Sequence, residues 1–240
     1  MQGLNRIYYT NPPLRGEDMG RKKKNLSVPQ ATGDVLFHFE PKNESQRKVA
    51  ENYYKKDVLF LIGPAGSGKT HSAMACALKD HLAGEKEHIL VVRPAIEAGG
   101  ESLGHLPGNV DEKMDPYFMP IRRLLKRMVF KLPEDVILFQ PLAYMRGDTF
   151  ENTVLFLDEA QNASYAQIKM FLTRMGQNSK VIISGDPDQT DVRPRNPDRA
   201  NCDMMSIVKR LAPLKEVEVI DFSNEESLRH PLIKSILSRL

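Results

Sequence analysis

The pattern in this sequence that most directly predicts chemistry is the glycine-rich segment Gly63-Pro64-Ala65-Gly66-Ser67-Gly68-Lys69-Thr70. It fits the P-loop pattern G-x-x-x-x-G-K-S/T, in which successive backbone N–H groups turn inward around phosphates. Lys69 adds a cation for the β- and γ-phosphates, and the Thr70 hydroxyl is a ligand for magnesium. The segment follows an apolar run and precedes a helical one, as a phosphate-binding loop requires. We therefore expect it to bind a nucleoside triphosphate, ATP with Mg²⁺.

Two adjacent carboxylates, Asp158 and Glu159, come directly after the apolar run Val154–Leu157. Downstream of a P-loop, Asp158 is predicted to hold the magnesium ion through its water shell, and Glu159 to orient or deprotonate the attacking water. Taken alone, the same pair is a common turn or helix cap. Because a kinase must exclude water, a carboxylate that activates water favours hydrolysis over transfer to a small molecule.

Three further side chains are candidates for the same site, each with a structural alternative. Gln189 ends the loop Ser184-Gly185-Asp186-Pro187-Asp188-Gln189, where its amide could contact the attacking water and the γ-phosphate, although the loop is also a good turn sequence. Gln46 lies in a helical stretch over residues 43–54 and could pair with the adenine edge, or be a surface glutamine. Arg229, near the chain end, could be a catalytic arginine or one half of a structural ion pair.

The elements that must position these residues are predicted from six short apolar runs. Runs in which apolar residues do not alternate with polar ones are typical of strands that are buried on both faces of a parallel sheet. Helical patterns separate most of them, which predicts βαβ units with their carboxyl ends, and hence the ligand, at one edge of the sheet. The runs are Val58–Ile62, Ile89–Val92, Val136–Phe139, Val154–Leu157, Val181–Ile183 and Val217–Ile220.

Three helices are expected between the strands. One covers Thr70–Leu82, and a second has apolar residues at the spacing of Ile121, Leu124, Leu125 and Met128. The third runs through Ile168, Phe171, Leu172 and Met175, opened by a Ser164-x-x-Gln167 capping box and closed by Gly176.

Length and composition fit one α/β domain. The chain has 240 residues, of which 41% are hydrophobic, enough for a single core. We expect a domain over residues 39–240, a mainly parallel sheet flanked by helices, preceded by an irregular arm over residues 1–38. The basic run Arg21-Lys22-Lys23-Lys24 in this arm is either a phosphate contact or a solvated tail.

The remaining composition restricts the partners and the compartment. A net charge of +3 is too small to indicate nucleic acid, so that case depends on Arg93 and on the local cluster Arg122, Arg123, Lys126 and Arg127, which could equally be a solvated helix face. Cys76 and Cys202 lack the spacing of a disulfide framework or a zinc site. The apolar runs are too short to span a bilayer. These observations predict a cytoplasmic protein with no membrane partner.

Taken in order, the motifs resemble the PhoH family of P-loop ATPases from about Phe39 to the chain end. The matching segments are Gly63–Thr70, Val91-Val92-Arg93-Pro94, Tyr144-Met145-Arg146-Gly147, Leu157-Asp158-Glu159-Ala160-Gln161-Asn162, Leu172-Thr173-Arg174-Met175-Gly176, Gly185-Asp186-Pro187-Asp188-Gln189 and Arg229-His230-Pro231-Leu232.

The resemblance implies a RecA-like core similar to the first motor domain of superfamily-one helicases, and ATP-dependent action on RNA or single-stranded nucleic acid. It also implies the site roles given above for Gly66–Thr70, Asp158, Glu159 and Gln189. Two segments depart from the family: Asp148 stands where relatives usually carry a second arginine, and Arg195-Asn196-Pro197-Asp198-Arg199 lacks the usual glycine-bearing pattern.

Two other classes of function remain open from the residues. One is a nucleotide-gated binding protein that changes its assembly with ATP and unwinds nothing. The other is a small-molecule kinase, which Glu159 disfavours. A lone RecA-like domain leaves the γ-phosphate open on one side, so we expect a homo-oligomer, a hexameric ring, in which Arg229 of one subunit completes the site of the next.

Overall fold

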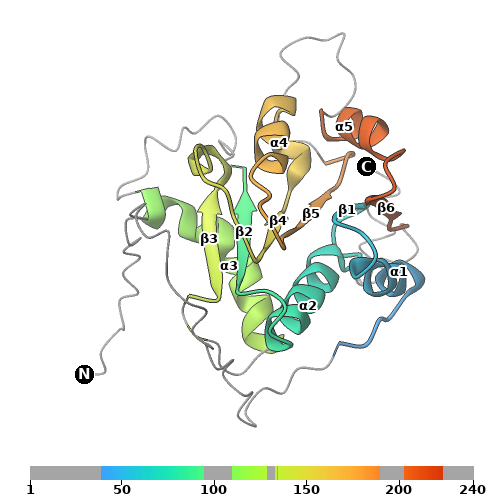
Figure 1. The fold of residues 1–240 in the computed structure, drawn as a ribbon, viewed down its shortest axis with the longest axis horizontal. Helices are drawn as coiled ribbons and strands as arrows, with labels where there is room; N and C mark the ends of the chain where they lie inside the picture. The colour runs from blue at the N-terminus through green and yellow to red at the C-terminus, as the bar shows by residue number, and fades with distance from the viewer. Residues whose placement is uncertain (1–38, 95–109, 129–132, 134, 190–202, 224–240) are drawn as a thin grey trace, which may run out of the picture. The chain divides into compact units, whose positions relative to one another are not determined.

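The computed structural model describes residues 39–94, 110–128, 133, 135–189 and 203–223 (Figure 1). The irregular arm expected over residues 1–38, the segment 195–199 and Arg229 all lie outside these ranges. Within them, a six-stranded sheet stands between two layers of helices.

All neighbouring strands are parallel, and their order across the sheet is β3-β2-β4-β5-β1-β6. The six predicted apolar runs are therefore confirmed as strands. One strand, β5, separates β1 from β4, so the P-loop and Asp158 follow strands that are not direct neighbours. The strands are β1 (Val58–Ile62), β2 (His88–Arg93), β3 (Ile137–Pro141), β4 (Thr153–Leu157), β5 (Lys180–Gly185) and β6 (Val217–Asp221).

The helices form two layers, one on each face of the sheet. Successive residues of a strand point alternately to one layer and to the other. Leu59 and Leu61 of β1 face α1 (Glu44–Tyr53), α2 (Lys69–Leu82) and α3 (Val110–Met128). Phe60 and Ile62 point to the opposite layer. That layer contains α4 (Tyr165–Leu172), α5 (Asp203–Leu211) and the short 3-10 turns η3 (Leu142–Tyr144) and η4 (Ala160–Asn162).

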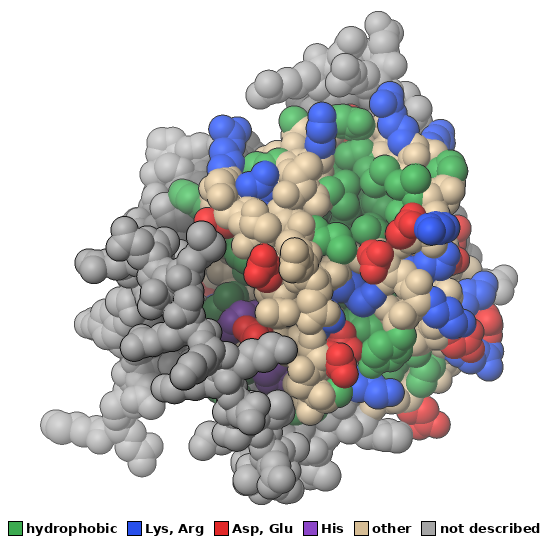
Figure 2. Space-filling model, viewed as in Figure 1, with side chains coloured by type: hydrophobic (Ala, Val, Ile, Leu, Met, Phe, Trp, Pro, Cys, Tyr) green, Lys and Arg blue, Asp and Glu red, His purple; other side chains and the backbone are tan. Residues whose placement is uncertain are grey.

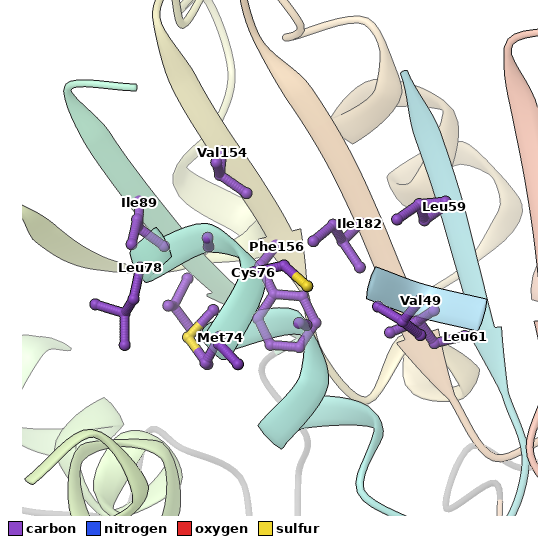
Figure 3. Packing of buried hydrophobic residues seen from close by; sticks show 14 of the residues in the cluster. Val49, Leu59, Leu61, Met74, Cys76, Leu78, Ile89, Val154, Phe156 and Ile182 are labelled. Atoms are coloured by element: carbon purple, nitrogen blue, oxygen red, sulfur yellow. The ribbon is translucent and has the colours of Figure 1, made fainter. Parts of the chain in front are cut away.

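Helix α2 follows the P-loop directly and packs into the hydrophobic core. Figure 3 shows Met74, Cys76 and Leu78 lying against strand side chains that include Ile89 and Phe156. Cys76 is only 4% exposed. Truncating a buried Leu, Met or Phe in such a layer to Ala costs about 2–5 kcal/mol, so this packing holds α2 firmly against the sheet.

Helix α4 confirms one prediction and corrects another. The Ser164 side chain accepts from the backbone of Gln167, whose side chain accepts from the Ser164 backbone, as the capping box predicts. The helix ends at Leu172, however, so Met175 is not part of it and Gly176 does not terminate it. Gly176 instead lets two loops approach, since a Cβ there would lie 2.5 Å from the Phe150 carbonyl oxygen, which accepts from the Gly176 N–H.

Helix α5 was not among the expected elements. Its apolar residues Met204, Ile207 and Val208 follow helical spacing, but the helix is short. None of the described helices has the length and apolar character needed to cross a membrane.

Candidate nucleotide-binding site

The P-loop joins the end of β1 to the start of α2 and borders a cavity of about 190 Å³. Gly68 is the N-cap of α2, with φ +97, and a Cβ there would lie 2.4 Å from Gln46 Nε2. The backbone conformation therefore favours glycine at this position, and any larger residue would also have to displace the Gln46 side chain. The cavity is lined by Ala65, Gly66, Gly68, Lys69, Thr70, His71, Asp158, Glu159, Ser184, Gly185 and Asp186.

The loop is braced by its own side chains and by the neighbouring strand. Ser67 Oγ donates to the Pro64 carbonyl oxygen at 2.8 Å, and Gly63 N–H donates to the Gly185 oxygen at 3.2 Å. Lys69 Nζ donates to the carbonyls of Gly63 and Pro64, at 2.6 and 2.8 Å. The lysine cation is thus held at the phosphate-binding loop.

Asp158 follows β4 and is nearly fully buried. Its Oδ1 accepts from Ser184 Oγ at 2.7 Å and from Thr70 Oγ1 at 3.2 Å. Its Oδ2 accepts from Arg93 Nε at 3.0 Å and Nη2 at 2.5 Å. Since burying a carboxylate is costly unless it is paired and hydrogen-bonded, these contacts offset the cost of burying Asp158.

Glu159 adopts a left-handed backbone conformation, with φ 58 and ψ 40. A non-glycine residue in this region costs of the order of 1–3 kcal/mol, and such outliers concentrate at functional sites. Its side chain is 45% exposed, and its Oε2 accepts from Gln161 Nε2 at 2.7 Å. The backbone turn and Gln161 together direct the carboxylate toward the cavity, which Glu159 lines.

The loop after β5 contacts the P-loop directly. Asp186 Oδ2 accepts from the Ala65 N–H at 3.1 Å, and its backbone N–H donates to Gln161 Oε1 at 3.1 Å. Gln161 therefore connects Glu159 to this loop. Gln189 closes a turn through its N–H to the Asp186 oxygen, and its exposed side chain is not among those lining the cavity. Its role as a γ-phosphate sensor stays a prediction.

Gln46 is buried beneath the P-loop rather than on a helix surface. Its Oε1 accepts from the Lys42 N–H at 2.9 Å, and its Nε2 donates to the Ser67 oxygen at 3.4 Å. These contacts position it as a support for the loop, and adenine pairing stays a prediction. Nearby, His71 lies 5.5 Å from Phe39 between ring centroids. Burial, together with the Lys42 charge, lowers the pKa of His71, which favours the neutral form of its imidazole.

The oxygen atoms of Thr70 and Asp158 fit a magnesium site. Mg²⁺ prefers oxygen ligands and is usually bound by one or two protein groups together with substrate phosphates. Within the described ranges, no group of three His, Cys, Asp or Glu side chains could cage a metal by itself. A shared site completed by nucleotide phosphates is therefore the arrangement that these residues fit.

Arg93 and Ser184 carry no local pattern that assigns them to this site, and Gln161 carries only a weak one. The sequence suggests Arg93 as a nucleic-acid contact, whereas its guanidinium binds Asp158. Gln161 had a weak signal, since it stands two residues after Glu159. Asp148, which departs from the family pattern, offers its carbonyl to Arg174 Nη1 at 3.0 Å.

A model of the family described as "PhoH-like protein" matches residues 38–240. The PhoH-like protein of Bacillus subtilis is 38% identical over 202 residues, covering 82% of this chain and 62% of the relative. That of Synechocystis is 39% identical over 224 residues, covering 90% of this chain and 65% of the relative. The chain thus spans somewhat less than two thirds of these relatives.

Among solved structures, the large terminase of a thermophilic bacteriophage superposes with a TM-score of 0.53 at 13% identity, covering 83% of this chain and 50% of the other. At this identity the likeness shows only the fold, a RecA-like P-loop NTPase domain. Fold, ordered motifs and family model agree, and the chain belongs to the PhoH-like protein family.

Proposed function

We propose that this chain binds ATP with Mg²⁺ at the P-loop and hydrolyses it. The supporting observation is that three segments far apart in sequence, the P-loop, Asp158-Glu159 and Ser184-Gly185-Asp186, line one cavity. Loop amides and Lys69 would bind the phosphates, while Thr70 and Asp158 would hold the metal, which supplies charge stabilisation. Glu159 would orient or deprotonate the attacking water, and Gln189 would sense the γ-phosphate.

We further propose RNA or single-stranded nucleic acid as the stimulating partner. Figure 2 shows Lys and Arg side chains interspersed with Asp and Glu on the face in view, so a polynucleotide would need a local cluster. Helix α3 offers one in Arg123, Lys126 and Arg127, which are exposed. Arg122 differs, because it pairs with Asp115 at 3.3 Å and stacks on Phe139 at 4.0 Å.

The active form in this proposal is a homo-oligomer, with a hexameric ring favoured. The half-exposed Glu159 side chain leaves room for a neighbouring subunit at the cavity. Arg229 would be the group inserted from that neighbour, where a guanidinium stabilises charge on the transferring phosphoryl group.

The test is phosphate release from ATP, measured with Mg²⁺ or EDTA and with or without single-stranded RNA or DNA. Magnesium-dependent turnover that a polynucleotide stimulates would support both parts of the proposal. Magnesium-dependent ATP binding with slow, unstimulated turnover would favour a nucleotide-gated assembly protein, an alternative consistent with the Gln161 contact that restrains Glu159. A failure to bind ATP would overturn the proposal.

A further inference from the structure

Arg93 stands at the end of β2, between the two carboxylates of the site and helix α3. Two of its nitrogens donate to Asp158 Oδ2, and its Nη2 lies 3.9 Å from Glu159 Oε1. Its Nη1 donates to the carbonyl oxygen of Tyr117 in α3. The Arg93 side chain is 14% exposed and that of Asp158 only 3%, so the ion pair is largely removed from water.

The hydrogen-bonding capacity of Asp158 is fully used. A carboxylate has about four lone-pair sites, and Asp158 accepts four hydrogen bonds, from Ser184, Thr70 and two nitrogens of Arg93. A magnesium ion or its water shell must therefore replace one donor. Thr70 can stay, because a hydroxyl that donates its proton still offers lone pairs to a metal. Since Ser184 is fully buried, Arg93 is the donor placed to yield.

A second position for the guanidinium lies close by. Nη2 needs to move by only about 1 Å to bring Glu159 Oε1 within hydrogen-bond distance. The Tyr117 carbonyl connects any such movement to α3, because the same guanidinium contacts both.

We propose that Arg93 is a positioning residue that competes with magnesium for Asp158 and turns toward Glu159 when the metal binds. Metal binding, the placement of Glu159 and the position of α3 are thereby coupled. This inference rests on the proposed function, because it concerns the metal that accompanies ATP.

Removing Arg93 has two opposing effects on metal binding. It loosens Asp158, which weakens metal binding, but Ser184 and Thr70 still hold Oδ1. It also eliminates the repulsion between a guanidinium and a divalent cation that share one carboxylate. Coulomb repulsion at this range, in a site mostly shielded from water, outweighs the loosening of Asp158. The variant should therefore bind the metal-nucleotide complex more tightly.

The experiment compares Arg93→Gln with Arg174→Gln, a control arginine whose contacts include the backbone oxygens of Met170 and Asp148. A fluorescent, non-hydrolysable ATP analogue is titrated in excess Mg²⁺ and in EDTA. In Arg93→Gln, Kd in Mg²⁺ should fall by at least about 10-fold, with Kd in EDTA unchanged or raised. The Arg174→Gln values should match the wild type. If Kd in EDTA rises while Kd in Mg²⁺ stays constant, Arg93 is a phosphate ligand and the inference is wrong.

The coupling to α3 has its own readout, hydrogen–deuterium exchange. In the wild type, the analogue with Mg²⁺ should change the exchange of residues 115–128, and this change should be absent in Arg93→Gln. An equal change in both proteins would refute the coupling. If Arg93→Gln does not fold, Arg93→Met replaces it, because it also removes the positive charge while keeping an apolar stem of similar length. A Kd in Mg²⁺ equal to the wild-type value would then count against the inference. Failure of the wild type to bind the analogue would refute the proposed function instead.

Discussion

At the scale of single residues, Lys69 is the cation bound to the P-loop, through the carbonyls of Gly63 and Pro64. Lys69→Ala should abolish tight ATP binding, because the loop then lacks its charge-assisted hydrogen bonds to the terminal phosphates. Titration with labelled ATP measures the reduced affinity. Lys79→Ala, an exposed change on the same helix, is the control and should leave the affinity unchanged. Near wild-type affinity for Lys69→Ala would contradict the site assignment.

Glu159 allows the chemical step to be separated from binding. Glu159→Gln should keep ATP affinity and slow hydrolysis by at least ~100-fold, within the range expected for loss of a general base. The amide oxygen can still accept from Gln161, so the local geometry should persist. Single-turnover phosphate release measures the effect, with exposed Glu151→Gln as the control. Normal turnover would mean that another group handles the water.

At the scale of elements, the sequence is informative wherever the signal is local. The P-loop, the Asp158-Glu159 pair and the six strands could be predicted because each is a contiguous run with its own pattern. The capping box of α4 could be predicted for the same reason. The end of that helix could not be predicted. Gly176 is a glycine because the backbone of Phe150, which is distant along the chain, passes close to it.

The part of the site that the sequence does not reveal depends on strand order. Arg93 reaches Asp158 because β2 and β4 are neighbours, and no local pattern specifies which strands pair. Ser184 is buried beside Asp158 for the same reason, since β5 pairs with β4. Long-range pairing therefore accounts for the residues that local patterns miss.

Helix α3 gives a prediction for polynucleotide binding. Replacing Arg123, Lys126 and Arg127 with Ala should weaken RNA binding regardless of base sequence and flatten its salt dependence, by about one unit of slope for each phosphate that is no longer neutralised. Filter binding over a range of salt concentrations measures the slope. Arg122→Ala is the comparison, because that side chain is occupied by Asp115 and Phe139 and should affect stability more than the slope. An unchanged slope in the triple variant would assign these residues to solvent.

At the scale of the whole molecule, assembly determines whether one chain is sufficient for hydrolysis. Arg229→Ala should reduce hydrolysis strongly and leave ATP binding nearly intact if Arg229 has the proposed role, because a catalytic arginine stabilises the transition state and not the bound substrate. Mixing it with Lys69→Ala protein should restore some activity at interfaces that combine one intact P-loop with one intact arginine. Light scattering with ATP and Mg²⁺ gives the oligomeric state. A fully active monomer would rule out the arrangement in trans.

Because Cys76 is buried in α2, the rate at which its thiol is alkylated measures how often this helix separates from the sheet. Burial raises the pKa of this thiol to about 12, so at neutral pH it is protonated as well as inaccessible. In a Cys202→Ser variant, alkylation by iodoacetamide should therefore proceed only through transient separation of α2 from the sheet. Because the P-loop leads into this helix, saturating ATP with Mg²⁺ should slow the alkylation, by a factor that approaches 1 + [L]/Kd. Mass spectrometry of the Cys76 peptide over time would measure how much bound nucleotide slows the alkylation. An identical rate with and without ATP would show that nucleotide binding leaves the opening of α2 unaffected.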